Sequence, residues 1–408
     1  MLIQYRLNQY RLNQYARYAT TLLLLMGAGL SRADFMDELV NGITTTSADL
    51  SFRLHYEDVN TDRQRNASGA TLQSRLRIET GEFLHSQFTV ELENISTLTG
   101  RDFSNGVRNE GTAVIADPDV TEFNQVYFRF NGIPRSILQI GRQVIQLDND
   151  RFIGDVGFRQ NQQTYDAISL LSKPVSNVSV YYAHLRAVNT IFGRKAANGK
   201  QHHNSDLLNI QYQFSERMDA SAYHYRLENE DVPGVDHNTT GLRFSVSWPM
   251  EMVSPGVNLE FARQSTRGTQ PSADTNYQLL EASIKRGRHQ LIIGNETLGA
   301  SKGVAFQTPL ATLHKFQGFT DQFLTTPADG LKDEYVTYRL NLGPGRIELT
   351  AHDFESDRNN RAFGKEHSIG AWYRIGDRGK ILVKWARFDG ARHSGDIRKY
   401  WLQLSYDL

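Results

Sequence analysis

Apolar residues recur at every second position in many short segments of the chain. Within 50–57, apolar and polar side chains take turns: Leu50, Phe52, Leu54 and Tyr56 against Ser51, Arg53, His55 and Glu57. The same period of two runs through 208–214, 242–248 and 402–408. Successive side chains of a β-strand point to opposite faces, so this pattern predicts strands with one apolar face.

Eighteen such segments follow one another from about residue 48 to Leu408, and their connections are alternately long and short. The short connections hold turn residues, as in Asn131–Pro134 and Gly343–Gly345, whereas the long ones are polar and run from about nine residues to over thirty. The expected strands are 48–57, 71–80, 83–94, 123–130, 136–145, 164–171, 176–186, 206–214, 218–228, 239–248, 256–264, 276–284, 288–297, 332–341, 345–354, 366–374, 380–388 and 398–408. The faces of 136–145, 176–186 and 276–284 are ambiguous, and bulges are expected there.

Bacterial outer-membrane barrels combine an even number of strands with short periplasmic turns and long external loops. The chain is therefore predicted to be all-β, with a transmembrane antiparallel up-and-down β-barrel of about 18 strands over residues 48–408 and both termini periplasmic. The chain stops on a strand, so the first and last strands can pair and close the sheet. A soluble β-sandwich or β-helix is the alternative, but neither requires loop lengths that alternate in this way.

Composition agrees with a barrel in the bacterial outer membrane. The chain has 45 basic and 45 acidic residues, no cysteine and an aromatic fraction of 11 %. Its low mean hydropathy is expected, because only every second residue of a membrane strand faces lipid. The sequence holds no apolar run of the length that a membrane-spanning helix needs.

The N-terminal residues 1–33 have the features of a secretory signal peptide. Arg6, Arg11 and Arg17 precede the apolar stretch 19–30, and small residues surround a cleavage site after Ala33. The following segment, 34–47, is predicted to be periplasmic and to include a short helix. Its apolar residues have helical spacing: Phe35, Met36, Leu39, Val40 and Ile43.

A barrel of this size is wide enough for an aqueous channel, and its expected inward positions carry many charges. The basic ones are Arg53, Arg75, Arg77, Arg129, Arg226, Arg243, Arg339, Arg374 and Lys384; the acidic ones are Glu79, Glu91, Glu93, Glu228, Glu260, Glu296 and Glu348. Two interpretations stay open. Opposite charges on neighbouring strands, such as Arg75 and Glu91, can form ladders that stiffen the wall. Alternatively, arginines around a constriction can make the pore anion-selective.

Several stretches resemble the alginate-export family of outer-membrane proteins. They are SFRLHYEDVN at 51–60, FNQVY at 123–127, LQIGRQVIQLDNDRFIGDVGFRQNQQTYDA at 138–167 and FQTPLATLHKFQGFTDQFL at 306–324. The resemblance implies a monomeric barrel of eighteen strands with an arginine-rich constriction for an acidic polysaccharide. By position, it implies that Arg142 lies near the pore and that Asp166 continues into the wall. Arg151 and Arg159, also expected to line the pore, would lie around its external mouth or fold inward with their loop. It also implies that the loop 298–331 folds over or into the lumen, with Thr308, His314, Lys315, Phe316, Phe319 and Asp321 forming the constriction.

The predicted function is passive diffusion or export of anionic or sugar-like solutes, including acidic polysaccharides such as alginate. A general or nutrient-specific uptake porin, commonly a trimer, is the main alternative. A receptor or adhesin acting through its loops is another. A barrel enzyme, with Ser301 and His314 as a candidate pair, is disfavoured because the sequence contains neither G-x-S-x-G nor H-E-x-x-H.

The expected partners are outer-membrane lipid, the solute and the barrel-assembly machinery during insertion. No cofactor, metal or nucleic-acid site is expected. His202 and His203, with His184 and His224, offer a cation site in principle, but exposed loop histidines are the simpler interpretation.

Overall fold

The computed structural model describes residues 32–100, 102–108, 110–232, 236–267, 272–391 and 394–408. The predicted signal peptide lies outside these ranges, apart from its last two residues. No helix in the described ranges has the length and apolar character needed to cross a membrane.

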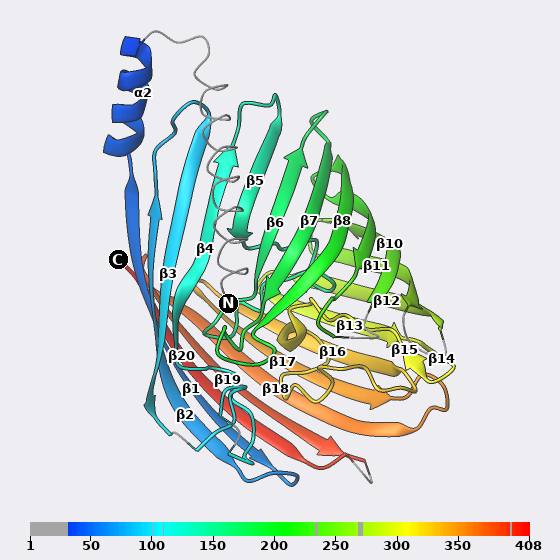
Figure 1. The fold of residues 1–408 in the computed structure, drawn as a ribbon. Coiled ribbons are helices and arrows are strands. Elements are labelled where there is room, and N and C mark those ends of the chain that lie inside the picture. The colour runs from blue at the N-terminus through cyan, green and yellow to red at the C-terminus, as the bar shows by residue number, and fades with distance from the viewer. Residues whose placement is uncertain (1–31, 101, 109, 233–235, 268–271, 392–393) are drawn as a thin grey trace.

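Eighteen antiparallel strands form one closed ring, as the sequence predicts (Figure 1). The strands of the ring are β1 (Ser47–Thr61), β2 (Ala67–Glu79), β3 (Ser86–Thr99), β4 (Val120–Phe130), β5 (Ser136–Gln143), β6 (Thr164–Ser172), β7 (Val178–Asn189), β8 (Lys200–Ser215), β9 (Met218–Leu227), β10 (Asp236–Ser247), β11 (Ser254–Arg267), β12 (Asp274–Arg286), β13 (His289–Leu298), β16 (Leu331–Leu342), β17 (Gly345–Glu355), β18 (Ala362–Ile375), β19 (Gly379–Gly390) and β20 (Ile397–Asp407). Each strand pairs with its neighbour along the chain, and β1 pairs with β20 from Ser51↔Asp407 to Thr61↔Ile397. This last pairing closes the barrel.

The two faces of the strands follow the predicted alternation. In β1, His55 and Glu57 are each 1 % exposed, whereas Tyr56 between them is 38 % exposed. Leu208, Ile210, Tyr212 and Phe214 of β8 are all exposed to the outside. Apolar side chains therefore form the outer surface, while the interior holds both polar side chains and a buried apolar cluster.

The two ends of the barrel differ, and we call them the turn end and the loop end. The short connections, such as 131–135 and 343–344, gather at the turn end. Aromatic side chains follow the outer wall there: Phe214, Trp248 and Tyr406 are each about half exposed. Such a girdle is expected at a membrane interface.

Several connections at the loop end are shorter than the sequence suggests. Strand β1 extends to Thr61 and β2 begins at Ala67, so only residues 62–66 connect them. The expected strands ended earlier because polar residues occupy both faces at this end, although the backbone ladder continues. Only 100–119, 144–163 and 299–330 are long; the last contains the hairpin β14 (Ala300–Ser301) and β15 (Val304–Ala305) and the 3-10 helix η1 (Leu313–Lys315).

The predicted N-terminal helix is present as α2 (Arg32–Thr44) at the turn end. The ring of Phe35 packs edge-on against Phe83 at 5.3 Å, and the Glu38 carboxylate accepts a hydrogen bond from the Leu84 backbone N–H at 3.3 Å. Leu84 falls within the expected strand 83–94, but β3 begins only at Ser86. Leu84 lies in a turn beneath α2 and is buried.

Bulges interrupt the ladder at several places. Of the three segments expected to contain one, β7 does, between Leu185 and Ala187, whereas β5 and β12 keep a regular register over their described pairs. A shift between Glu91 and Leu92 also turns both Asn124 and Gln125 of β4 inward, where both are buried.

We expect Val336→Lys to lower the free energy of unfolding by about 2–4 kcal/mol, because Val336 faces lipid near the middle of β16. The measurement is equilibrium unfolding in urea with lipid vesicles. Asn295→Lys is the control: Asn295 shares the outer face but lies beside the Glu334 carboxylate, so its effect should be small. Equal effects of the two substitutions would mean that the lipid-facing band has been placed wrongly.

Candidate functional site

Two long loops meet inside the barrel and fill much of its lumen. The Gly154 N–H donates to the Leu310 carbonyl at 2.8 Å, and the Thr312 N–H donates to the Asp150 carbonyl at 3.0 Å. Through these bonds the segment 144–163 lies alongside the segment 299–330, which crosses the inside of the ring in Figure 1. The sequence places both segments near the pore only through the family resemblance.

Where the loops touch the wall, they form an apolar cluster. The ring of Phe152 lies 5.1 Å from Tyr223, 5.3 Å from Tyr277 and 5.9 Å from Phe306. These side chains are at most 8 % exposed. The loops therefore pack against inward-facing tyrosines of the strands.

Arg151 links the two loops to the wall. Its Nε donates to Glu296 of β13 at 2.6 Å, and its Nη1 donates to Thr308 at 2.9 Å. Its guanidinium also lies 4.8 Å from the ring centre of Phe316. The Arg151 side chain is completely buried, so it holds the loops in place rather than facing a solute.

Asp321 is the centre of a buried ionic network. Its carboxylate accepts hydrogen bonds from His314 at 2.7 Å, Lys399 at 2.9 Å and Arg159 at 3.2 Å. Arg159 also pairs with Glu57 of β1 at 2.5 Å. Burial opposes ionisation of Asp321, but His314, Lys399 and Arg159 outweigh burial and hold the pKa of Asp321 well below its usual range.

His314 joins this network to the open part of the lumen. Burial lowers the pKa of His314 to about 3, although Asp321 acts in the opposite direction. The neutral imidazole donates through Nδ1 to Asp321 and accepts through Nε2 from the Lys384 ammonium at 2.9 Å. It is also stacked on Phe158, with 3.9 Å between ring centres.

Glu366 of β18 fixes the backbone of the same loop. Its carboxylate accepts from the Phe319 N–H at 2.6 Å, the Thr320 N–H at 3.1 Å and the Thr320 hydroxyl at 2.5 Å. Gly318, with a φ of +82°, lies so close to Glu366 that a Cβ atom would collide with the carboxylate. Glycine at position 318 is therefore a steric requirement of this attachment.

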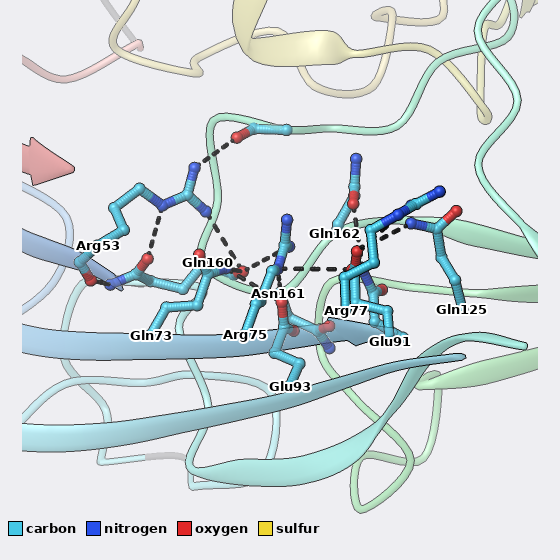
Figure 2. A network of polar contacts seen from close by, with 12 residues as sticks. Arg53, Gln73, Arg75, Arg77, Glu91, Glu93, Gln125, Gln160, Asn161 and Gln162 are labelled. Carbon is cyan, nitrogen blue, oxygen red and sulfur yellow. Dashed lines mark hydrogen bonds and ion pairs between the residues drawn. The ribbon is translucent and has the colours of Figure 1, made fainter. Parts of the chain in front are cut away.

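A second polar network covers the wall formed by β1–β4 (Figure 2). Arg53 donates to the Gln160 side chain and to the Gly157 carbonyl, each at 2.8 Å. Arg75 binds Glu93 and lies 3.9 Å from Glu91, as the ladder interpretation predicts.

Arg77 extends this network along the wall. It pairs with Glu79 at 2.8 Å and donates to the Tyr127 hydroxyl at 2.9 Å. Its side chain is nevertheless 30 % exposed, so Arg77 stays accessible from the lumen.

A cavity of about 510 Å³ lies between the loop tip 312–319 and the wall formed by β10–β19. Its charged lining residues are Arg243, Lys315, Arg339, Arg346, Lys384, Glu281, Glu296, Asp333 and Glu348. Arg243 pairs with Glu260 at 2.8 Å, and Arg339 pairs with Glu348.

Two cations of this cavity lie against aromatic rings. The guanidinium of Arg346 lies 4.7 Å from the ring centre of Trp372, and the ammonium of Lys384 lies 3.4 Å from that of Phe319. Neither cation forms an ion pair with a carboxylate in the part of the chain that the structure describes. Of the two, Arg346 is partly exposed, whereas Lys384 is only 5 % exposed and also binds His314.

Arg142 and Asp166 were predicted at the pore and in the wall, respectively. Both are in the wall, but they point outward. The inward side chains at this level are Gln143 and Tyr165, both buried, and Asp166 shares its face with the exposed Ile168. Arg142 Nε donates to Asp166 at 2.7 Å on the outer surface. The prediction of a pore role for Arg142 was therefore wrong.

Arg226 was also wrongly predicted to face the lumen. Its neighbours Tyr225 and Leu227 are the buried, inward residues, and Arg226 lies outside, paired with Asp206 at 2.5 Å and Glu228 at 2.7 Å. Polar residues occupy both faces of β9 near the loop end, so polarity alone does not identify the inward face there.

The remaining predicted residues occupy less central positions. Arg129 lies inward with its guanidinium 5.7 Å from the Tyr127 ring centre, and Arg374 shares the inward face of β18 close to the turn end, where it is exposed. Lys315 pairs with Asp150 at 3.1 Å.

The candidate histidines do not form a cation site. His184 and His224 bind Asp206 and Thr240, whereas His202 and His203 bind Asp231 and Ser205. The described residues contain no group of three or more potential metal ligands.

Sequence reasoning missed Lys399, Arg346 and the inward loop 100–119. Lys399 and Arg346 alternate with other inward residues, Trp401 and Glu348, so strand periodicity could have found them. No local signal marks the loop 100–119, which enters the lumen through Asp117. That carboxylate lies 2.8 Å from His55 Nδ1 and accepts from the Gln160 N–H at 3.1 Å.

Comparisons with known proteins agree with this architecture. The sequence model of the family described as alginate export matches residues 30–305. A comparison with curated protein sequences gives no match.

Several solved structures share the fold. OccK9 (OpdG) of Pseudomonas aeruginosa has a TM-score of 0.72 at 15 % identity, covering 90 % of this chain and 99 % of its own. OpdK of the same organism, solved with vanillate, has a TM-score of 0.71 at 15 % identity with the same coverage. OccAB4 of Acinetobacter baumannii has a TM-score of 0.70 at 12 % identity, covering 89 % of this chain and 98 % of its own. At such identities the likeness establishes the fold alone.

We expect Asp321→Ala to lower the free energy of unfolding by about 3–5 kcal/mol, because it leaves Arg159 and Lys399 buried without their shared carboxylate. Urea unfolding monitored by tryptophan fluorescence measures this. Asp274→Ala is the matched control. It removes an exposed carboxylate paired with Arg263 and should change stability little. A loss for Asp321→Ala no larger than for the control would contradict a central role for the network.

Proposed function

The chain belongs to the alginate export family of the bacterial outer membrane, and from this membership we propose that it is a passive channel for anionic or sugar-like solutes. In this proposal the turn end and both termini face the periplasm, the loop end faces outward, and the barrel acts as a monomer. Acidic oligosaccharides built from uronates are the solute class that best suits the lumen.

The observation that carries the proposal is the pair of cations on aromatic rings in the lumen cavity. Arg346 lies over Trp372 and Lys384 over Phe319, and neither is neutralised by a carboxylate of the described chain. A uronate presents a carboxylate beside an apolar C–H face. Guanidinium groups bind carboxylates in bidentate fashion, and indole rings stack well on apolar surfaces, so both halves of such a sugar have a partner.

The opposite wall supports the same assignment more weakly. Arg75 and Arg77 are partly exposed, but each is already engaged by a glutamate. They raise the local potential for an anion without offering a free guanidinium. In this proposal Arg75 and Arg77 attract the anionic solute electrostatically, whereas Arg346 and Lys384 contact it directly.

A second candidate is an uptake porin for small organic acids. The specific observation in its favour is that the structurally similar OpdK was solved with vanillate. The cavity of about 510 Å³ has room for a solute of that size. A small acid would need only the cations, whereas a uronate chain would also use Trp372.

We expect Arg346→Gln to reduce anion preference, because it removes a cation that no carboxylate of the described chain offsets. The measurement is the reversal potential of planar bilayers in a KCl gradient. Arg142→Gln is the control, since that side chain lies on the outer wall. An unchanged reversal potential for Arg346→Gln, or an equal shift for both variants, would remove Arg346 from the conduction path.

Oligouronates should block the current of the wild-type channel. Arg346→Gln should weaken this block by about tenfold, because one charge-assisted hydrogen bond to the solute is lost. Trp372→Leu should also weaken oligouronate block, because it removes the indole face on which the sugar would stack. Block by vanillate alone would favour the uptake porin.

We also expect conductance to rise when residues 308–325 are replaced by Gly-Gly, because this segment occupies the lumen. Two residues are enough to join the ends, because Gln307 and Thr326 are already close: the Gln307 side-chain amide hydrogen-bonds the backbone N–H and carbonyl of Thr326. Single-channel conductance is the measurement. Replacing 358–360 at the rim by Gly-Gly serves as the control. Equal conductance in all three proteins would mean that the segment does not restrict the pore.

A further inference from the structure

The barrel wall has a notch at the loop end beside β5. This strand is only eight residues long, and it pairs with β4 only from Val126↔Arg142 to Phe130↔Leu138. The outer half of β4, 120–125, pairs with β3 but has no strand on its other side. Figure 1 shows β5 ending part-way along the wall, where the chain turns into the lumen.

Loop residues close this notch without a β-ladder. Lys195 Nζ donates to the Asp119 carbonyl at 3.3 Å, and the Arg194 N–H donates to the Glu122 carboxylate at 3.4 Å. From the lumen side, Asn161 donates to the same Glu122 at 3.1 Å. Gly141, with a φ of +127°, is so close to the Val126 carbonyl that no side chain fits between β5 and β4.

The outer side of the notch is a cavity of about 380 Å³. One side of it is apolar, formed by Phe123 and Val126; Phe123 is 54 % exposed. The other side is charged, formed by Glu122, Arg142, Asp166 and Arg194. The cavity is thus amphipathic and opens to the surroundings of the barrel, not to the pore.

The charged side carries an excess of positive charge. Asp166 accepts hydrogen bonds from Arg142 at 2.7 Å, Lys200 at 2.9 Å and Asn189 at 3.0 Å. Among the lining residues, Arg142 and Arg194 face the carboxylates of Asp166 and Glu122; Lys200, which binds Asp166, adds a further basic group beside the cavity. Counting Lys200, one basic group remains in excess.

This cavity lies at the edge of the apolar band. Arg142 is two residues beyond the exposed Ile140 on the same face of β5, a distance of about 7 Å along a strand. Charged side chains, Arg142 and Asp166, replace apolar ones on this face, as expected where headgroups replace hydrocarbon. An outward-facing arginine at this depth has anionic headgroups as its natural neighbours.

We propose that the notch binds a phosphorylated glycolipid of the outer leaflet. Its phosphate lies between Arg142 and Arg194, and an acyl chain lies along Phe123 and Val126. This site rests on the proposed orientation of the barrel, with the loop end outward, but not on what the channel conducts. A free phosphate ion shares the headgroup chemistry and lacks the acyl chain.

Lipid binding tests this directly. The purified protein in dodecyl maltoside is titrated with diphosphoryl lipid A, and bound lipid is counted by native mass spectrometry. We expect the double variant Arg142→Gln/Arg194→Gln to weaken binding by about tenfold or more, because charge-assisted contacts to phosphate are lost. Arg263→Gln is the control; this exposed arginine pairs with Asp274 on the outer wall but lies away from the notch.

Each outcome decides the proposal. Loss in the double variant, with retention in Arg263→Gln, supports it. The proposal is overturned if the double variant binds lipid A as well as Arg263→Gln does. It is also overturned if the wild-type protein binds fully dephosphorylated lipid A as well as diphosphoryl lipid A. Thermal protection by inorganic phosphate equal to that by lipid A would assign a free-anion site instead.

A folding defect is separable from a binding defect. Arg194→Gln alone leaves the Arg142–Asp166 pair and the Arg194 backbone contact intact, and heat-modifiable mobility in SDS gels reports the folded barrel. This single variant should still bind lipid A several-fold more weakly. Unchanged binding by folded Arg194→Gln would remove Arg194 from the site, and the proposal fails with it.

Discussion

Closure of the β-sheet is the constraint on which the whole molecule depends. An unpaired backbone group in hydrocarbon costs several kcal/mol, so the pairing of β1 with β20 is as necessary as any apolar contact. A ring of 18 strands leaves an interior too wide to be filled by strand side chains alone. The long loops enter that space, and the shape of the lumen follows from how they are held there.

The loops are held mainly by buried charges and only partly by apolar packing. Asp321 and Glu366 each receive three hydrogen bonds, the first from side chains and the second from the loop itself. Such groups are expensive to bury, and the net gain in stability from them is small. What they provide is position: a carboxylate with three fixed donors allows one loop conformation. A polar attachment also presents groups to the lumen that water can solvate, which an apolar plug would not.

The strands were predictable because the apolar outer band imposes a period of two over most of each strand. All eighteen expected segments correspond to strands of the ring. The inward folding of the loops was not predictable from local sequence, because its contacts are remote. Arg151 meets Glu296, 145 residues away, and Arg159 meets Glu57, 102 residues away. Only the family resemblance pointed to these loops, and it did not identify their partners.

Arg226 was misplaced because its face was assigned by polarity, whereas Arg142 was placed at the pore through the family resemblance. Face assignment by polarity works only where one face touches hydrocarbon, and near the loop end both faces are polar. Conversely, an ionised pair on the outer wall marks the height at which hydrocarbon has ended, since a charge at the membrane midplane costs about 2–4 kcal/mol. The apolar band on β5 and β6 must therefore stop between Ile140 and Arg142, and between Ile168 and Asp166. Arg142 and Asp166 thus locate the membrane boundary on this side of the barrel.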